Sequence, residues 1–156
     1  MRMRGWLQAA AAFCALIASC GAAEGDASRY DAALAAELGA DDYGMRAYVF
    51  VLLRTGPAEI ADEKLRAELF AGHFANMKRL ADDGDLVLAG PLGGDDGKRG
   101  LFVLAAPDID AAKAMIGEDP TVAAGVFVAE YSPFYGSAAL MRLNDMHQRI
   151  QKKPIE

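Results

Sequence analysis

The sequence predicts an α+β fold in which a four-stranded antiparallel sheet carries two helices on one face. Four apolar, β-rich runs and two amphipathic helical patterns follow one another in the order strand, helix, strand, strand, helix, strand. This βαββαβ order is that of ferredoxin-like domains. The helices leave the other face of the sheet open. An apolar face of this size is expected to bury itself against a second copy of the chain, so a homodimer is expected.

The first nineteen residues resemble an export signal. Arg2 and Arg4 give a positive start, residues 6–17 are mostly apolar, and small residues follow. The sequence Ile-Ala-Ser-Cys that ends at Cys20 resembles a bacterial lipobox. We expect residues 1–19 to be removed and Cys20 to carry lipid, which would hold the protein in a membrane. The alternative is an ordinary secretory signal that happens to contain a cysteine.

Removal of this segment decides what the two cysteines can do. Cys14 leaves with the signal and Cys20 is lipidated, so the mature chain is expected to have neither a free thiol nor a disulfide. Zinc–thiolate and cysteine-nucleophile chemistry are thereby excluded. We expect a lipid-anchored protein on the periplasmic face of the bacterial cell envelope, and Gly21 after the cysteine is compatible with sorting to the outer membrane.

Length and charge limit the remaining possibilities. Loss of two arginines and no acidic residue changes the formal charge from −6 to −8. This argues against a nucleic-acid partner, because phosphate binding requires a basic face. The expected organisation is a signal peptide at 1–19, a lipidated cysteine, tether and short helix at 20–44, a core domain at 45–136, and an added C-terminal helix and tail at 137–156.

The elements before the central helix are a short helix and a strand. Residues 29–38 place Ala32, Leu34, Ala35 and Leu38 at helical spacing before Gly39 stops the pattern. Residues 48–53 form a continuous apolar run that predicts a buried strand, and Gly56-Pro57 ends it.

The central helix begins after Asp62, which can cap its first turn. An apolar stripe then repeats at three and four residues as far as Ala81, and Gly84 supplies the left-handed position that turns the chain out. His73 falls on this stripe. One interpretation is a core histidine with a satisfied hydrogen bond, and the functional interpretation requires a partner elsewhere in the chain.

The second half of the core repeats the pattern. A strand at 86–89 ends at Gly90-Pro91, and the turn at 93–98 is rich in residues that tolerate positive φ, which indicates a hairpin rather than a phosphate loop. A strand at 101–106 precedes a helix that Asp108 can cap and that ends near Gly117. A fourth strand is expected at 126–131, in a run that continues to Pro133, and a helix is expected to begin at Ser137.

Several of these segments together resemble the YciI-like family. They are His73, Leu80-Ala-Asp-Asp-Gly-Asp-Leu-Val-Leu-Ala-Gly-Pro91, Asp119-Pro120 with Ala123-Ala-Gly125, and Ser132-Pro-Phe-Tyr135. The resemblance implies a ferredoxin-like dimeric α/β barrel, similar to muconolactone isomerase, with a histidine–aspartate pair in a pocket. The matching residues here are His73 and Asp119. Thr121 stands where the family often has an aromatic residue, and the family is commonly cytoplasmic, whereas this chain carries an export signal.

Five further residues are expected to lie in the pocket beside the pair. The expected pocket residues are Asn76, Met77, Gly90, Pro91 and Pro120. Asn76 lies one turn along from His73, so it could reach the pocket or cap a polar edge. No cofactor signature is present, and two separated histidines, His73 and His147, have no metal-ligand spacing. We therefore expect neither a cofactor nor a metal.

Two functions from different classes fit these observations. A carboxylate bonded to one imidazole nitrogen would leave the other free as a base, which suits an isomerase or lyase acting on a small organic molecule. Asp119 could instead be an ordinary turn residue that bonds nearby amides before Pro120. The alternative function is then a membrane-tethered, non-catalytic binding module for a small ligand or an envelope protein.

Overall fold

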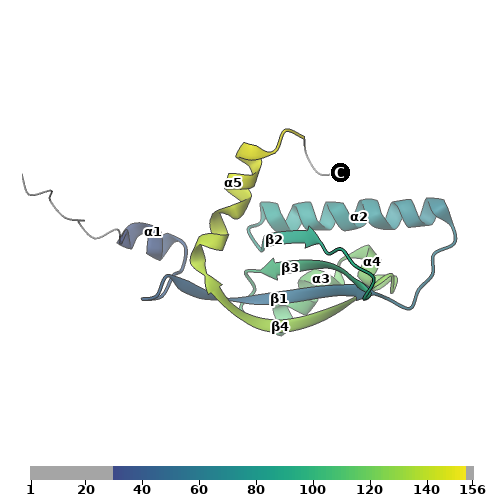
Figure 1. The fold of residues 1–156 in the computed structure, drawn as a ribbon, viewed down its shortest axis with the longest axis horizontal. Coiled ribbons are helices and arrows are strands. Elements are labelled where there is room, and N and C mark those ends of the chain that lie inside the picture. Colours follow the sequence, from purple (N-terminus) through teal and green to yellow (C-terminus); the bar gives the residue numbers. More distant parts are fainter. Residues whose placement is uncertain (1–29, 154–156) are drawn as a thin grey trace, which may run out of the picture.

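The computed structural model describes residues 30–153 and confirms the ferredoxin-like fold. The strands are β1 (Met45–Thr55), β2 (Leu86–Pro91), β3 (Lys98–Leu104) and β4 (Phe127–Ser137), and they form one sheet in the order β2-β3-β1-β4. Every neighbouring pair is antiparallel. The helices are α1 (Ala32–Glu37), α2 (Glu63–Asp82), α3 (Ile109–Gly117), α4 (Pro120–Ala123) and α5 (Leu143–Ile150), with a 3₁₀ turn, η1 (Ala138–Arg142), before α5 (Figure 1).

The main core lies between one face of the sheet and helices α2 and α3. Alternate residues of β1 point into it, and Val49, Val51 and Leu53 are each no more than 2 % exposed. Leu80 of α2 and Ile116 of α3 meet them from the other side. The helical and strand periods of the sequence therefore agree on a single buried layer.

Both ends of α2 are those that the sequence predicts. The Asp62 carboxylate accepts hydrogen bonds from the backbone N–H groups of Lys64 and Leu65, and Gly84 turns the chain at a φ of 83°. No helix among residues 30–153 is both long and apolar enough to cross a membrane.

Strand β4 is longer than the expected strand at 126–131. It continues through Pro133 to Ser137 and pairs with β1 along its whole length. Proline is tolerated there because β4 is an edge strand, where a missing N–H costs no pairing with a further neighbour.

The second face of the sheet is partly covered by the C-terminal segment. Leu140 and Met141 pack against a small core of Tyr48, Val87 and Val103. The Asn144 side chain donates a hydrogen bond to the carbonyl of Leu86 at 2.7 Å. The expectation of a wholly open face is therefore corrected. Three large apolar side chains remain at least one third exposed on it: Leu88, Val128 and Phe134.

Candidate functional site

Helix α2 carries His73 into the interior of the domain. The helix is 20 residues long, and its buried residues are His73, Asn76 and Leu80, which are spaced three and four apart along one face. His73 is only 7 % exposed. Its imidazole therefore requires an internal hydrogen-bond partner, because a buried unpaired polar group is costly.

That partner is Asp119, the N-cap residue of the short helix α4. Asp119 is fully buried, and its Oδ2 lies 2.6 Å from Nδ1 of His73. Its Oδ1 accepts hydrogen bonds from the Thr121 backbone N–H at 2.9 Å and from the Thr121 hydroxyl at 2.6 Å. Asp119 thus acts both as the turn residue and as the partner of the histidine. The two interpretations of the sequence are not exclusive.

These hydrogen bonds decide the charge of the carboxyl. Burial by itself raises the pKa of Asp119, but the hydrogen bonds from His73 and Thr121 outweigh it and hold that pKa below its ordinary value of 3.8. Asp119 is therefore ionised at neutral pH. An ionised acceptor at Nδ1 requires the proton to reside there, which leaves the lone pair of Nε2 free when the ring is neutral.

Four phenyl rings surround the imidazole. The ring centroids of Phe70, Phe74, Phe102 and Phe127 lie 5.5–6.3 Å from that of His73. Three of the four rings meet the imidazole edge-on. The pair is thus held in an apolar cage in which water competes weakly for its hydrogen bond.

Close packing between α2 and α4 fixes the distance between the two residues. Gly72 precedes His73, and a Cβ atom at Gly72 would lie 2.7 Å from Cγ of Pro120. The absence of a side chain therefore allows the proline, and with it Asp119, to approach the helix.

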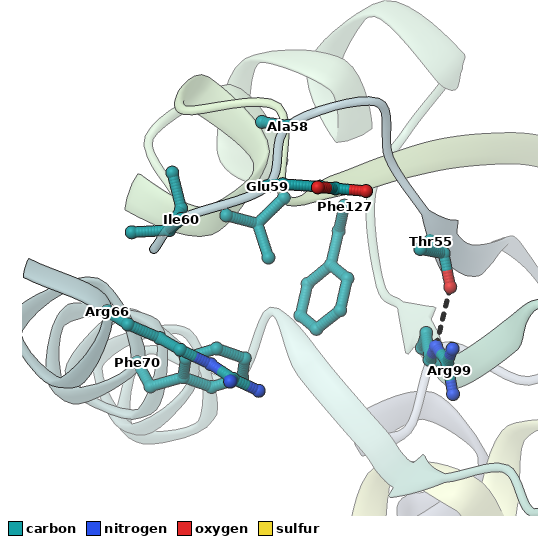
Figure 2. A pocket seen from close by; sticks show the side chains of 9 residues that line it. Thr55, Ala58, Glu59, Ile60, Arg66, Phe70, Arg99 and Phe127 are labelled. Carbon is teal, nitrogen blue, oxygen red and sulfur yellow. Dashed lines mark hydrogen bonds between the residues drawn. The ribbon is translucent and has the colours of Figure 1, made fainter. Parts of the chain in front are cut away.

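A cleft of about 570 Å³ lies on the far side of two of these phenyl rings. We call it the Arg66/Arg99 cleft. Its lining comes from five segments of the chain: Thr55, Ala58, Glu59, Ile60, Arg66, Phe70, Arg99, Val126 and Phe127 (Figure 2). A second hollow of about 450 Å³ shares Arg66 and Phe70 with it. Neither His73 nor Asp119 lines either of the two.

Comparison with known proteins places the core of this chain in a domain family. A model of the YCII-related domain matches residues 47–135. The chain belongs to this family. No curated protein matches the chain. Among solved structures, the YCII-related domain is similar to 5-chloro-2-hydroxyhydroquinone dehydrochlorinase from Burkholderia phenoliruptrix AC1100, determined with 2,5-dihydroxybenzoquinone. The identity is 20 %, the TM-score 0.38, and the match covers 55 % of this chain and 90 % of that one.

The expected pocket residues of this YCII-related domain are dispersed. Asn76 is buried, and its side-chain oxygen accepts a hydrogen bond from Arg79. Met77 packs against the main core, and Pro120 packs on Gly72. Gly90 and Pro91 lie on β2. None of the five lines the Arg66/Arg99 cleft, and their role in a pocket stays a prediction.

Sequence reasoning missed two groups of residues in this domain. The first is Thr121, which the family resemblance marks only as a departure from an aromatic residue, although a Thr two residues after an Asp turn residue can bond its carboxylate. The cleft residues are separated along the chain, and their sole local signal is the spacing of Arg66 and Phe70, one helical turn apart.

The possible metal ligands are scattered over the described part of the chain. Within residues 30–153, no three side chains of His, Cys, Asp or Glu are grouped so that they could hold a metal ion. His147, expected at the surface, is exposed on α5. The predicted export signal at 1–19 and the predicted lipidation site, Cys20, lie outside the described residues.

Proposed function

We propose that the protein is a small-molecule enzyme of isomerase or lyase type that uses His73 as its acid and base. The hydrogen bond of 2.6 Å between Nδ1 of His73 and Oδ2 of the ionised Asp119 is the observation that carries the proposal. It fixes the tautomer and stabilises the imidazolium that forms when Nε2 accepts a proton.

The chemistry is a proton transfer on an activated small molecule. Nε2 takes a proton from carbon next to a carbonyl, and the electron pair of the broken C–H bond moves into the conjugated system. In an isomerisation, the imidazolium then returns the proton to another carbon. In an elimination, a leaving group departs with the electron pair and the imidazolium gives its proton to that group or to water. General acid–base catalysis by one positioned side chain accelerates a reaction by about 10²- to 10⁴-fold.

The first test does not require a substrate. In a ¹H–¹⁵N spectrum of the imidazoles, Nδ1 of His73 is expected to be protonated, with its proton shifted strongly downfield. That resonance should disappear in Asp119→Asn, whereas the signals of exposed His147 should be unchanged. A His73 protonated at Nε2 in the wild type would contradict the proposed tautomer.

The second test uses turnover. Small phenolic and carbonyl compounds would be incubated with the wild type and His73→Gln, and products followed by absorbance and mass spectrometry. We expect turnover of any substrate found to fall by about 10²-fold or more in His73→Gln. Unchanged turnover in that variant would exclude the mechanism.

A non-catalytic binding module is a second candidate, and one observation favours it. Phe70 and Phe127 separate His73 from the Arg66/Arg99 cleft, so the imidazole does not line that cleft. Under this alternative, ligands would bind without conversion, and His73 and Asp119 would serve stability alone. Detection of any product would exclude it.

Assembly and location complete the proposal. A homodimer would bury the apolar side chains that remain exposed on the sheet face, which include Val128 and Phe134. Light scattering after size exclusion would measure the mass directly. Lipidation of Cys20 would place the domain at the cell envelope, and mass spectrometry of the N-terminal peptide after expression in a bacterium would detect the modification.

A further inference from the structure

The Arg66/Arg99 cleft combines a positive mouth with aromatic walls. Its apolar lining includes Phe70 and Phe127, whose rings meet edge-on with centroids 5.8 Å apart. Its volume of about 570 Å³ lies in the range in which proteins bind small molecules. The walls therefore suit a planar apolar group of the size of a substituted aromatic ring.

Two guanidinium groups border this space from different elements. Arg66 extends from α2 across the ring of Phe70, with its Cζ 5.9 Å from the ring centroid. Arg99 comes from β3, where its Nε donates a hydrogen bond to the Thr55 hydroxyl at 2.6 Å. Figure 2 shows the two side chains approaching the cleft from opposite sides, with the Phe127 ring between them.

The charges of both arginines are available to a ligand. Among residues 30–153, neither forms an ion pair, whereas Arg54, Arg79 and Arg142 each pair with a carboxylate. The hydrogen bond to Thr55 occupies only Nε of Arg99, so both of its terminal nitrogens stay free to donate. Glu59 is the one acidic residue of the lining, so two positive charges face one negative charge.

The cleft is also close to the proposed base. Phe127 and Phe70 form its wall, and the same rings lie 5.7 and 6.3 Å from the His73 ring. A ligand in the cleft is therefore separated from the imidazole by a single layer of side chains.

We propose that the Arg66/Arg99 cleft binds a planar aromatic carboxylate, with the ring against Phe127 and Phe70 and the anion attracted by the positive charges of the two guanidinium groups. Guanidinium groups bind carboxylates through parallel hydrogen bonds, which a compact ammonium group cannot reproduce. The claim that such carboxylates are substrates of the enzyme rests on the proposed function. The claim that they bind in the cleft does not.

The test compares benzoate with benzamide, which has the same ring without the charge. Binding to the intact protein would be followed by calorimetry and by the backbone NMR signals of Thr55 and Phe127. We expect benzoate to bind at least tenfold more tightly than benzamide. Arg66→Gln and Arg99→Gln should each weaken benzoate binding about tenfold, as expected for loss of one charge-assisted contact.

Matched variants separate the specific site from general charge effects. Arg149→Gln removes the same charge from an exposed position on α5 and should leave benzoate binding unchanged. Arg99→Lys keeps the charge without the planar fork and should give an intermediate loss. The proposal would be overturned if benzamide binds as tightly as benzoate or if benzoate shows no saturable binding. It would also be overturned if Arg149→Gln weakens benzoate binding as much as Arg66→Gln does.

The His73→Gln variant distinguishes this failure from failure of the proposed function. It should bind benzoate as the wild type does, because His73 does not line the cleft. Loss of turnover in His73→Gln with unchanged benzoate binding in the arginine variants would retain the enzyme mechanism and exclude the cleft. If instead turnover is unchanged in His73→Gln and the arginine variants bind benzoate more weakly, the cleft is retained as a binding site and the enzyme mechanism is excluded.

Discussion

Replacement of Thr121 by Val should remove one of three hydrogen bonds to a fully buried carboxylate. Two reach Oδ1 of Asp119 from the Thr121 backbone and hydroxyl, and the third joins Oδ2 to His73. Valine keeps nearly the same shape but lacks the hydroxyl that lies 2.6 Å from Oδ1. A hydrogen bond to a charged group contributes about 1.5–3 kcal/mol, so the free energy of unfolding at pH 7 should fall by that amount.

The size of this effect should depend on pH. The folded pKa of Asp119 lies below its ordinary value of 3.8, so the carboxylate contributes stability above pH 3.8 that is lost as the pH falls through the folded pKa. The Thr121 hydroxyl is one cause of that lowering. The stability difference between wild type and Thr121→Val should therefore be largest at neutral pH and decrease below pH 3.8.

Urea denaturation at a series of pH values measures both quantities. Thr121→Ser is the matched control, because it keeps the hydroxyl and removes a methyl group, at a cost of about 1 kcal/mol that should not change with pH. If Thr121→Val unfolds within about 0.5 kcal/mol of the wild type at pH 7, or if its deficit persists unchanged in acid, the hydroxyl does not stabilise an ionised carboxylate.

Three further substitutions test the buried pair, the packing of α2 on Pro120 and the docking of the C-terminal segment on the sheet. Asp119→Ala should lower the free energy of unfolding by about 3 kcal/mol in urea denaturation, because it leaves buried donors unpaired, and a loss below 1 kcal/mol would contradict the buried pair. Gly72→Ala should destabilise by about 1–2 kcal/mol through its clash with Pro120, whereas Gly117→Ala, with no atom within 4 Å of its new Cβ, should be neutral or stabilising by thermal melting. Leu140→Asp should destabilise by about 2 kcal/mol and increase binding of an apolar dye, since it detaches the C-terminal segment from the sheet, and an unchanged melting curve would show that this segment is not docked.

Local patterns predicted most of the fold because each element carries its own boundary signal. The Asp62 cap and the left-handed Gly84 fix α2, and both are present as predicted. The family motifs also predicted the meeting of His73 with Asp119, 46 residues apart. Strand β4 was predicted too short, since Pro133 signals an end locally, and only the position of the strand at the sheet edge makes it tolerable.

The features that were missed depend on how distant segments assemble. Coverage of the second sheet face by Leu140 depends on the direction in which the chain leaves β4, and periodicity does not encode that direction. The Arg66/Arg99 cleft likewise joins residues from five segments: the end of β1, the loop that follows it, α2, β3 and the start of β4. Most residues of such a site lack a repeating pattern, and only Arg66 and Phe70, one helical turn apart, are related by local spacing.

The segments before and after the sheet, which contain α1 and η1–α5, meet at one end of it (Figure 1). Arg142 of η1 pairs with Glu37 of α1, and Arg46 at the start of β1 donates to the carbonyl of Leu38. Thr55, at the other end of this 11-residue strand, lines the cleft. At about 3.4 Å per residue, the strand separates the cleft from the extensions by about 34 Å. If Cys20 is lipidated as the sequence predicts, the anchored residue precedes α1 in the sequence, and α1 lies at the end of β1 opposite to the cleft.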